Sequence, residues 1–375
     1  MTSRPRRALH VIRTMNRGGV ETWLMHVLRR SDPQLLQMDF LVHTDTPAAY
    51  DREIVERGSR LLRCRTSWRS PAYGCAVRSL VRQYGPYDAI HSHVHYFSGV
   101  LLALIRGLQV PTRIAHCHCD SFPRDLAAGW LRRRYIQAAK AGLERYATHW
   151  LAASEKAGRG LFGDQWRRDP RSQVLHCGID LEPFRQPEDR ECVRESLRVA
   201  ADELVVGHVG RFEQQKNHPF LVEIAAEAAR REPRLRLLLI GEGPARTLIE
   251  ERVRALGIGS RTNFLGSRAD VPRLLSAMDG FLFPSLCEGL PLTLLEAQAA
   301  GLPCLITDSI SSETDVASGL LHRLPLQAGA QAWANKLVTI LRNPKHNQPS
   351  GLAVLEKTDF NIQIALEGLY ALYGV

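Results

Sequence analysis

The chain has 375 residues, a mass of 42.1 kDa and a formal net charge of +10, with 45% hydrophobic and 23% charged residues. This composition fits a globular protein of about two domains and excludes disordered and collagen-like chains. The charge is unevenly distributed: residues 1–190 carry +12 and residues 191–375 carry −2. Nearly all the positive charge of the first half comes from arginine, whose side chain suits phosphate groups.

Apolar runs alternate with longer amphipathic ones along the chain, which is the pattern of parallel sheets wrapped by helices. In the first half the predicted strands are residues 8–12, 39–42, 88–93, 113–118 and 150–153, and the clearest helices are 20–30 and 131–146. In the second half the predicted strands are 204–209, 235–240, 262–264, 280–283 and 303–306. We therefore expect an α/β protein with two doubly wound, Rossmann-like domains facing a cleft.

The domain boundary is expected within residues 179–187, where two prolines and mixed charge predict a linker. We place the first domain at residues 1–183 and the second at 184–357. Residues 358–375 are expected to form a helix that packs back towards the first domain. Ligands of doubly wound domains bind beyond the carboxyl ends of the strands, so the loops there hold the candidate site residues.

The chain carries no sign of a membrane span or of an oxidising compartment. The longest apolar runs, such as Val100–Ile105, are far short of the roughly 20 residues that cross a bilayer as a helix. The apolar stretch behind the first arginines stops at Arg13, too soon for a secretory signal. The eight cysteines form no C-x-x-C pair. We expect a cytoplasmic protein with reduced thiols.

Two glutamates bracket the start of a helix that follows a predicted strand. This helix is expected to begin near Pro291 and to end at Gly301, with Glu288 on the loop before it and Glu296 inside it. Apolar residues surround Glu296, which disfavours a solvated carboxylate. Either Glu296 pairs with a neighbour, or both carboxylates accept hydrogen bonds from sugar hydroxyls while the helix amino terminus binds a phosphate. A sugar nucleotide has both features.

Two further loops carry groups that suit a diphosphate. The loop 210–217 leaves a strand with Arg211 and Lys216 placed to reach one anion, although such cations are also common on surfaces. Gly18 and Gly19 follow the first strand and open a helix, where they either let backbone amides approach a phosphate or form a simple tight turn.

These motifs resemble those of the family 4 retaining glycosyltransferases of the GT-B fold, in the branch that assembles bacterial exopolysaccharide and other surface glycans. The resemblance covers essentially the whole chain. Its most specific part is the spacing of Glu288 and Glu296 in the context Pro-Ser-x-x-Glu-Gly-Leu-Pro. Beside it stand Gly210-Arg-x-x-x-Gln-Lys-Asn, Gly241-Glu-Gly-Pro and Phe264-Leu-Gly-Ser-Arg.

The resemblance implies roles for individual residues. Arg211 and Lys216 are implied to bind the donor diphosphate, Glu288 the transferred sugar and Glu296 the ribose. The donor-binding residues that it implies are, in full, Gly18, Gly19, Arg211, Lys216, Gly241, Glu242, Gly266, Arg268, Glu288, Gly289, Leu290, Leu292 and Glu296. The residues implied to act in the transfer itself are His118, Glu288, Arg211 and Lys216.

Two segments depart from the usual sequence of the family. Cys177 stands where an asparagine is common, and we expect this change to affect only the hinge turn. Residues 310–315 replace a glycine-rich stretch that borders the sugar site, so they bear on which donor is accepted.

Histidines alternate near the ends of two predicted strands, at positions 91, 93 and 95 and at positions 116 and 118. Alternation in a strand puts every second side chain on one face, so the imidazoles and thiols of the run 116–119 point to opposite faces and disfavour a metal site there. No D-x-D triplet occurs either, and we expect no metal. His118 is similar in position to the histidine that the family keeps near the acceptor and the anomeric carbon, and His116 is the rival one pleat earlier.

The expected activity is a retaining, metal-independent hexosyl transfer from a UDP- or GDP-linked sugar to a hydroxyl of a lipid-linked glycan acceptor, with no further cofactor. A GT-B sugar-nucleotide epimerase and a non-catalytic assembly subunit are the alternatives. A dehydrogenase is disfavoured because no strand is followed by G-x-G-x-x-G, and nucleic acid because the arginines are not interleaved with aromatics.

A run of arginines at positions 132–134 follows Trp130 and Leu131. This segment fits either docking on an anionic membrane surface, at the inner face of the plasma membrane, or a solvated helix face.

Overall fold

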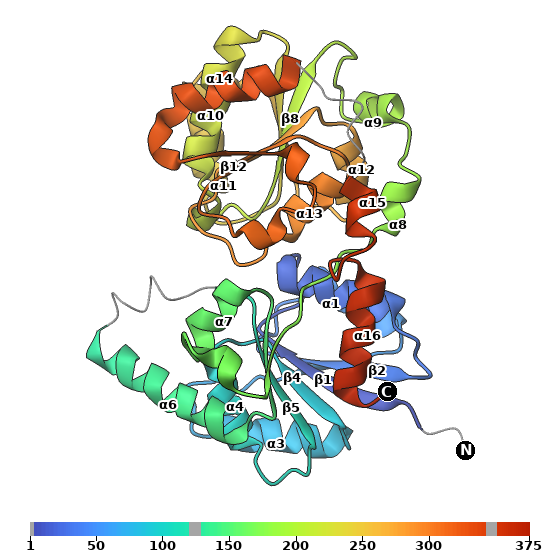
Figure 1. Cartoon of the computed structure of the whole chain (residues 1–375). Helices are drawn as coiled ribbons and strands as arrows, with labels where there is room; N and C mark the ends of the chain where they lie inside the picture. The colour runs from blue at the N-terminus through green and yellow to red at the C-terminus, as the bar shows by residue number, and fades with distance from the viewer. Residues whose placement is uncertain (1–3, 120–128, 343–350) are drawn as a thin grey trace. The chain divides into compact units, whose positions relative to one another are not determined.

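The computed structural model describes residues 4–119, 129–342 and 351–375, and these divide into two compact units (Figure 1). The amino-terminal unit comprises Met1–Gly178 and Ile362–Val375, and the carboxy-terminal unit comprises Ile179–Asn361. The segment 179–187, expected as a linker, opens the second unit and contains the short helix α8 (Glu182–Arg185).

The described residues of the amino-terminal unit form a seven-stranded parallel sheet in the order β3-β2-β1-β4-β5-β6-β7. The strands are β1 (Arg6–Ile12), β2 (Leu36–Val42), β3 (Leu61–Arg63), β4 (Ala89–Ser92), β5 (Thr112–Cys117), β6 (His149–Ala152) and β7 (Ser172–Val174). The helices are α1 (Gly19–Arg30), α2 (Asp51–Glu56), α3 (Tyr73–Tyr84), α4 (Phe97–Leu104), α6 (Trp130–Tyr146), α7 (Glu155–Phe162), η1 (Trp166–Arg168) and α16 (Ile362–Tyr373).

The carboxy-terminal unit holds a six-stranded parallel sheet, again among its described residues, in the order β10-β9-β8-β11-β12-β13. The strands are β8 (Leu204–Val209), β9 (Leu235–Ile240), β10 (Thr262–Gly266), β11 (Gly280–Phe283), β12 (Cys304–Thr307) and β13 (Leu321–Leu324). The α-helices after α8 are α9 (Arg190–Ser196), α10 (His218–Arg231), α11 (Arg246–Ala255), α12 (Val271–Ser276), α13 (Leu292–Ala299), α14 (Gly329–Arg342) and α15 (Gly351–Leu355). Short 3-10 turns are η2 (Gln214–Lys216), η3 (Gly259–Arg261), η4 (Ser312–Thr314), η5 (Ser318–Leu320) and η6 (Leu326–Ala328).

The expectation of two doubly wound α/β sheets is confirmed. Every strand predicted from an apolar run is present, with ends that shift by a few residues. The strands β3, β7 and β13 were missed, and all three lie at sheet edges. Edge strands are short and carry polar side chains, so they lack the apolar run by which central strands of a parallel sheet are recognised.

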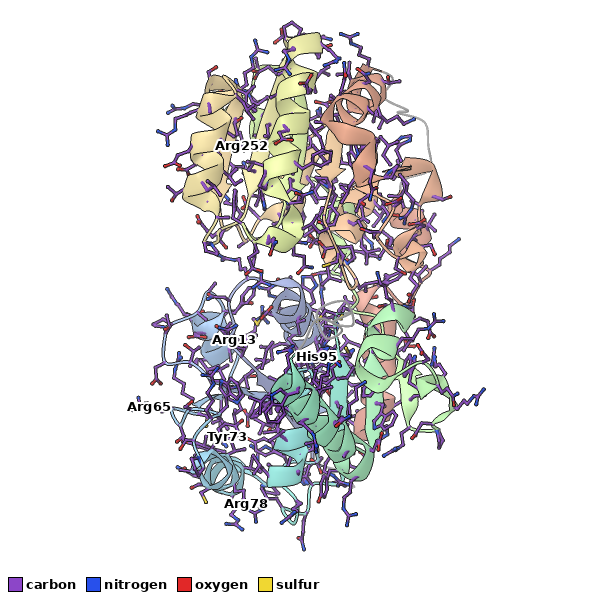
Figure 2. All side chains as sticks on the ribbon, turned by 90° about the vertical axis from the view of Figure 1, so that its left-hand side faces the viewer. Arg13, Arg65, Tyr73, Arg78, His95 and Arg252 are labelled. Carbon is purple, nitrogen blue, oxygen red and sulfur yellow. The ribbon has the colours of Figure 1, made fainter. Side chains whose placement is uncertain are left out.

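Part of the arginine excess in the first half of the chain forms ion pairs within the amino-terminal unit. Arg4 donates to Asp88 at 2.8 Å and Arg7 to Asp39 at 3.0 Å. Arg65 lies at the outer edge of the unit (Figure 2), where its side chain is 81% exposed and 3.3 Å from the carboxylate of Asp45. Arg4 and Arg7 thus pair with carboxylates of their own unit.

The last helix belongs to the amino-terminal unit, although almost two hundred residues of the carboxy-terminal unit precede it. In Figure 1, α16 (red) lies against α1, and contacts between the two helices confirm this packing. The hydroxyl of Tyr373 is 2.7 Å from Nδ1 of His91, and that of Tyr370 accepts a hydrogen bond from the amide of Asp32. Burial of Leu369 and Tyr373 makes this helix part of the core.

Substitution Leu369→Ala is expected to lower the free energy of unfolding of the amino-terminal unit by about 2–4 kcal/mol, because it leaves a cavity at a fully buried position. Urea unfolding followed by tryptophan fluorescence, in the native chain and in the variant, measures this change. The matched control is Ile364→Ala on the same helix, where the side chain is partly exposed and the loss is expected to stay below about 1 kcal/mol. Equal losses in the two variants would contradict the packing of α16.

Candidate active site

Four loops meet at the carboxyl ends of the strands β8, β9, β10 and β11 in the carboxy-terminal unit. Backbone hydrogen bonds connect them: the amide of Phe212 donates to the carbonyl of Glu242, that of Gly241 to Gly266, and that of Leu286 to Gln215. This edge of a doubly wound sheet is where ligands bind. The four loops are therefore held as one surface at the expected place.

Two glycines permit the close approach of these loops. Gly241 and Gly243 have φ angles of +142° and +158°, which side-chain-bearing residues rarely adopt. A Cβ atom on Gly241 would lie 2.0 Å from the carbonyl oxygen of Gly210, and one on Gly243 would lie 2.6 Å from that of Phe212. The Gly241-Glu-Gly-Pro motif is thus required by backbone contact with the loop 210–217.

A buried ion pair joins the loop 210–217 to the loop before α13. Nζ of Lys216 is 2.8 Å from Oε1 of Glu288, and Nε2 of Gln215 donates to the other carboxylate oxygen at 3.2 Å. The two charged side chains are only 17% and 6% exposed, and the Lys216 ammonium lies 4.6 Å from the ring centroid of Phe283. Both oxygens of Glu288 are therefore satisfied, which a buried carboxylate requires.

Glu296 lies on α13 among buried leucine and alanine side chains and is 7% exposed. Among the described residues, no side chain or amide donates a hydrogen bond to its carboxylate. Burial raises the pKa of this carboxyl group to about 7. The sequence left open whether Glu296 pairs with a neighbouring side chain or binds a ligand. The described residues contain no such pair. Glu296 instead has a carboxylate with free capacity to accept hydrogen bonds.

Arg211 differs from Lys216, Glu288 and Glu296, which are largely buried. Its side chain is 61% exposed and pairs with Glu213 at 3.1 Å, whereas Lys216 pairs with Glu288. The structure therefore does not direct Arg211 and Lys216 at one shared group. An exposed arginine can still move to an incoming anion, because its ion pair with Glu213 is worth little in water.

The remaining predicted donor residues lie around this surface. Glu242 pairs with Arg246, and a Cβ atom on Gly266 would lie 3.0 Å from a carboxylate oxygen of Glu242. Arg268 is held by Asp270 at 2.7 Å. The others lie at the entry to α13: Gly289 is buried, Leu290 is partly exposed, and Leu292 is the first residue of the helix.

Sequence reasoning missed three polar residues of this region. Gln215 binds Glu288, and the hydroxyls of Ser285 and Thr293 are buried with no hydrogen-bond partner in the part of the chain that the structure describes. Thr293 lies in the first turn of α13, where free amides and the positive end of the helix dipole favour an anion. Gln215 and Ser285 lie inside the quoted motifs, and Thr293 follows the second of these motifs by two residues, so closeness in sequence to Lys216 and to the helix start was the available signal.

The atypical segment 310–315 packs against α13. Nε2 of Gln298 donates to the carbonyl of Thr314 at 2.9 Å, and Oγ of Ser309 donates to the carbonyl of Leu286 at 3.3 Å. The segment 310–315 therefore supports the helix that bears Glu296, and Ser309, just before it, contacts the loop that bears Glu288.

The other predicted residues lie in the amino-terminal unit. Gly18 is the N-cap of α1 in extended conformation, and Gly19 begins that helix with open space around its missing Cβ atom. His118 follows the end of β5, with Nε2 at 2.9 Å from Nδ1 of His93 and Nδ1 at 3.5 Å from Sγ of Cys177. Burial lowers the pKa of His118 to about 3, so the imidazole is neutral at physiological pH.

The expectation that Cys177 affects only the hinge turn is wrong, because its thiol is buried beside His118. The contact joins residues 59 positions apart, which no local pattern reveals.

Comparison with known proteins decides the family. Residues 17–183 match the family model "Glycosyltransferase Family 4", and residues 189–351 match "Glycosyl transferases group 1". The putative glycosyltransferase EpsF of Bacillus subtilis is 38% identical over 342 residues, which cover 90% of this chain and 88% of EpsF. The chain belongs to glycosyltransferase family 4. The UDP-Gal:α-D-GlcNAc-diphosphoundecaprenol α-1,3-galactosyltransferase of Escherichia coli is 32% identical over 231 residues, 59% of this chain and 58% of that enzyme.

Solved structures confirm the GT-B fold of this family 4 glycosyltransferase. Anabaena HepE, crystallised with UDP and glucose, superposes with a TM-score of 0.79 at 18% identity and covers 98% of this chain and 99% of its own. The glycosyltransferase WaaG of lipopolysaccharide biosynthesis superposes with a TM-score of 0.67 at 20% identity, covering 98% and 97%. Within the described ranges, no helix of the chain combines the length and the apolarity needed to span a bilayer.

The stability of the carboxy-terminal unit is expected to depend on pH through Glu296. Because the folded-state pKa of about 7 exceeds the ordinary value of 4.5, the folded unit keeps a proton that the unfolded chain has lost between these values. The contribution of Glu296 to the free energy of unfolding is therefore fully present below about pH 4.5. It is lost as the pH rises to about 7, which lowers the free energy of unfolding by on the order of 1–3 kcal/mol.

The variant Glu296→Gln lacks this titration, so its melting temperature relative to the native protein is expected to rise between pH 5 and pH 8. Thermal melts across this range, without nucleotide, measure the difference. A constant difference at all pH values would show that Glu296 is ionised or exposed in the folded chain.

Proposed function

We propose that this glycosyltransferase moves a sugar, with retention of anomeric configuration, from a UDP- or GDP-linked donor to a hydroxyl of a lipid-linked glycan acceptor. The pathway is bacterial exopolysaccharide or surface polysaccharide biosynthesis. The observation that carries the proposal is the pair of carboxylates at the start of α13: Glu288, clamped by Lys216 and Gln215, and buried Glu296 with free capacity.

The chemistry of these groups suits a nucleotide sugar. Carboxylates accept hydrogen bonds from vicinal hydroxyls, so Glu288 would bind the transferred sugar and Glu296 the ribose. The amides of the first turn of α13 and the ammonium of Lys216 would bind the diphosphate between them. HepE, whose fold is similar, was crystallised with UDP and glucose, which supports this class of donor.

In the proposed transfer, the acceptor oxygen attacks the anomeric carbon from the face that the diphosphate leaves. The bond from that carbon to the phosphate oxygen breaks, the bond to the acceptor oxygen forms, and the leaving diphosphate takes the acceptor proton. Lys216, Arg211 and the α13 amides offset the charge that develops on the diphosphate, so neither a metal nor a cofactor is needed. Glu288 and Glu296 position the donor, and the neutral imidazole of His118 is assigned to the acceptor side.

We assign the acceptor to the lipid-linked class and place the protein at the inner face of the plasma membrane. The E. coli relative is named for a diphosphoundecaprenol acceptor, and EpsF supports an exopolysaccharide role. The first turns of α6 are exposed, with Trp130 at 70% and Leu131 at 66%, whereas its buried residues begin at Ala139. An apolar helix end beside arginines suits the surface of an anionic membrane.

The proposed activity is tested by following nucleotide release from UDP- and GDP-sugars with and without a polyprenyl-diphosphate glycan acceptor. We expect acceptor-dependent release with one nucleotide, and that nucleotide is expected to raise the melting temperature more than the other. Interconversion of the donor sugar without acceptor would identify an epimerase instead. Binding of nucleotide with no turnover under either condition would identify an assembly subunit.

Substitution Lys216→Ala is expected to lower kcat at least about 100-fold, because it removes a cation that stabilises the leaving diphosphate and uncovers the buried charge of Glu288. Initial rates with the preferred donor measure the loss, and circular dichroism checks the fold. The control is Lys336→Ala on α14, an exposed lysine whose loss should leave the rate unchanged. An unchanged kcat in Lys216→Ala would contradict the assignment of the donor site to this region.

The double variant Trp130→Glu with Leu131→Glu is expected to lose most binding to vesicles that contain anionic lipid, because it places charge at an apolar membrane contact. Sedimentation with anionic and neutral vesicles across a salt series measures binding, which should weaken as salt rises. Leu248→Glu, at a 60% exposed leucine of α11, is the control. If the native protein binds anionic and neutral vesicles equally at every salt concentration, docking on an anionic membrane is contradicted.

A further inference from the structure

Five histidines occupy one face of the sheet in the amino-terminal unit. They come from three neighbouring strands and the residues just after them: His10 in β1, His91 and His93 at the end of β4, and His116 and His118 at the end of β5. His10 is the register partner of His91, and the β4–β5 register sets His93 beside His116. Trp23 of α1 and Tyr373 of α16 cover this face with their rings.

The ring nitrogens of these histidines pair at distances a few tenths of an ångström shorter than those between the ligand atoms of a tetrahedral zinc ion. Nδ1 of His93 is 2.9 Å from Nε2 of His118, Nδ1 of His10 is 3.1 Å from Nε2 of His93, and Nε2 of His91 is 3.1 Å from Nδ1 of His116. With Zn–N bonds of about 2.0–2.1 Å, tetrahedral ligand atoms are about 3.3–3.4 Å apart. Small rotations of the rings convert one arrangement into the other.

Two overlapping groups of three have all their ligand atoms within 4.8 Å of one another: His10, His91 and His93, and His93, His116 and His118. The second group is the accessible one. His93 and His118 follow the strand ends and are partly exposed, so an ion can reach them, whereas His10 and His91 are fully buried. Burial also keeps these imidazoles neutral, which is the form that binds metals.

We propose that His93, His116 and His118 bind one divalent transition-metal ion of the zinc class, with a fourth position left to water. Three imidazoles are a ligand set that suits Zn²⁺, and also Ni²⁺ and Cu²⁺. Cys177 then contacts the second ring nitrogen of His118 and orients that ligand. This site departs from the expectation, drawn from the run 116–119 alone, that the chain holds no metal.

An ion at this site would bind the imidazole of His118, which the proposed function assigns to the acceptor side. Zinc is therefore expected to slow transfer, and this consequence rests on the proposed function. Binding itself does not, because it is measured without donor or acceptor.

The test is a titration of the full-length, metal-free protein with Zn²⁺ in competition with a chromogenic indicator. The native chain should bind one ion, and His93→Gln and His118→Gln should each weaken binding at least about tenfold. His149→Gln, at a partly buried histidine of β6 outside the cluster, is the matched control. His10→Gln removes a ligand of the inner group but only an outer hydrogen-bond partner of His93, so it should weaken binding less than His93→Gln or His118→Gln does.

Co²⁺ gives a second readout that does not depend on activity. The native protein should show the visible absorption of a tetrahedral nitrogen site, and His118→Gln should lose it while its melting temperature stays near that of His149→Gln. Native affinity in both His93→Gln and His118→Gln would overturn the proposal. Loss of binding in His10→Gln alone would overturn it in favour of the inner group.

Discussion

The ion pair between Lys216 and Glu288 is the interaction on which the candidate site depends. It connects two loops that leave different strands, and it is nearly excluded from water. A buried pair of this kind is stable only when both partners stay in place, so each loop fixes the other. The amide of Leu286, which donates to the carbonyl of Gln215, holds the same two loops together through the backbone.

Burial then gives the two glutamates different properties. Glu288 accepts hydrogen bonds on both oxygens, whereas Glu296, eight positions later, lies in an apolar helix that raises its pKa to about 7. An unsatisfied buried carboxylate costs free energy in the absence of ligand. Under the proposed function, donor hydroxyls that bind Glu296 would offset part of that cost.

The amino-terminal unit uses burial in another way. Its five clustered histidines have lowered pKa values because the sheet and two covering helices bury three of them fully and the other two in part. Neutral rings can share protons with one another or bind a metal, and the accessible end of the cluster includes the residue assigned to the acceptor side. One of the two covering helices, α16, comes from the far end of the chain, so this environment forms only when the whole unit has folded.

The sequence by itself determined the fold class and the donor-site motifs, because buried parallel strands are continuous apolar runs and because Glu288, Glu296, Lys216 and Gly241 lie in local patterns. It did not reveal the edge strands β3, β7 and β13, which are only three or four residues long and lack such runs, although it did predict the edge strand β10. Only the tertiary structure decided that Lys216 pairs with Glu288 while Arg211 does not, and that Cys177 lies beside His118. Those contacts join residues 72 and 59 positions apart, and the strand order and register that bring them together are set by packing of the whole sheet.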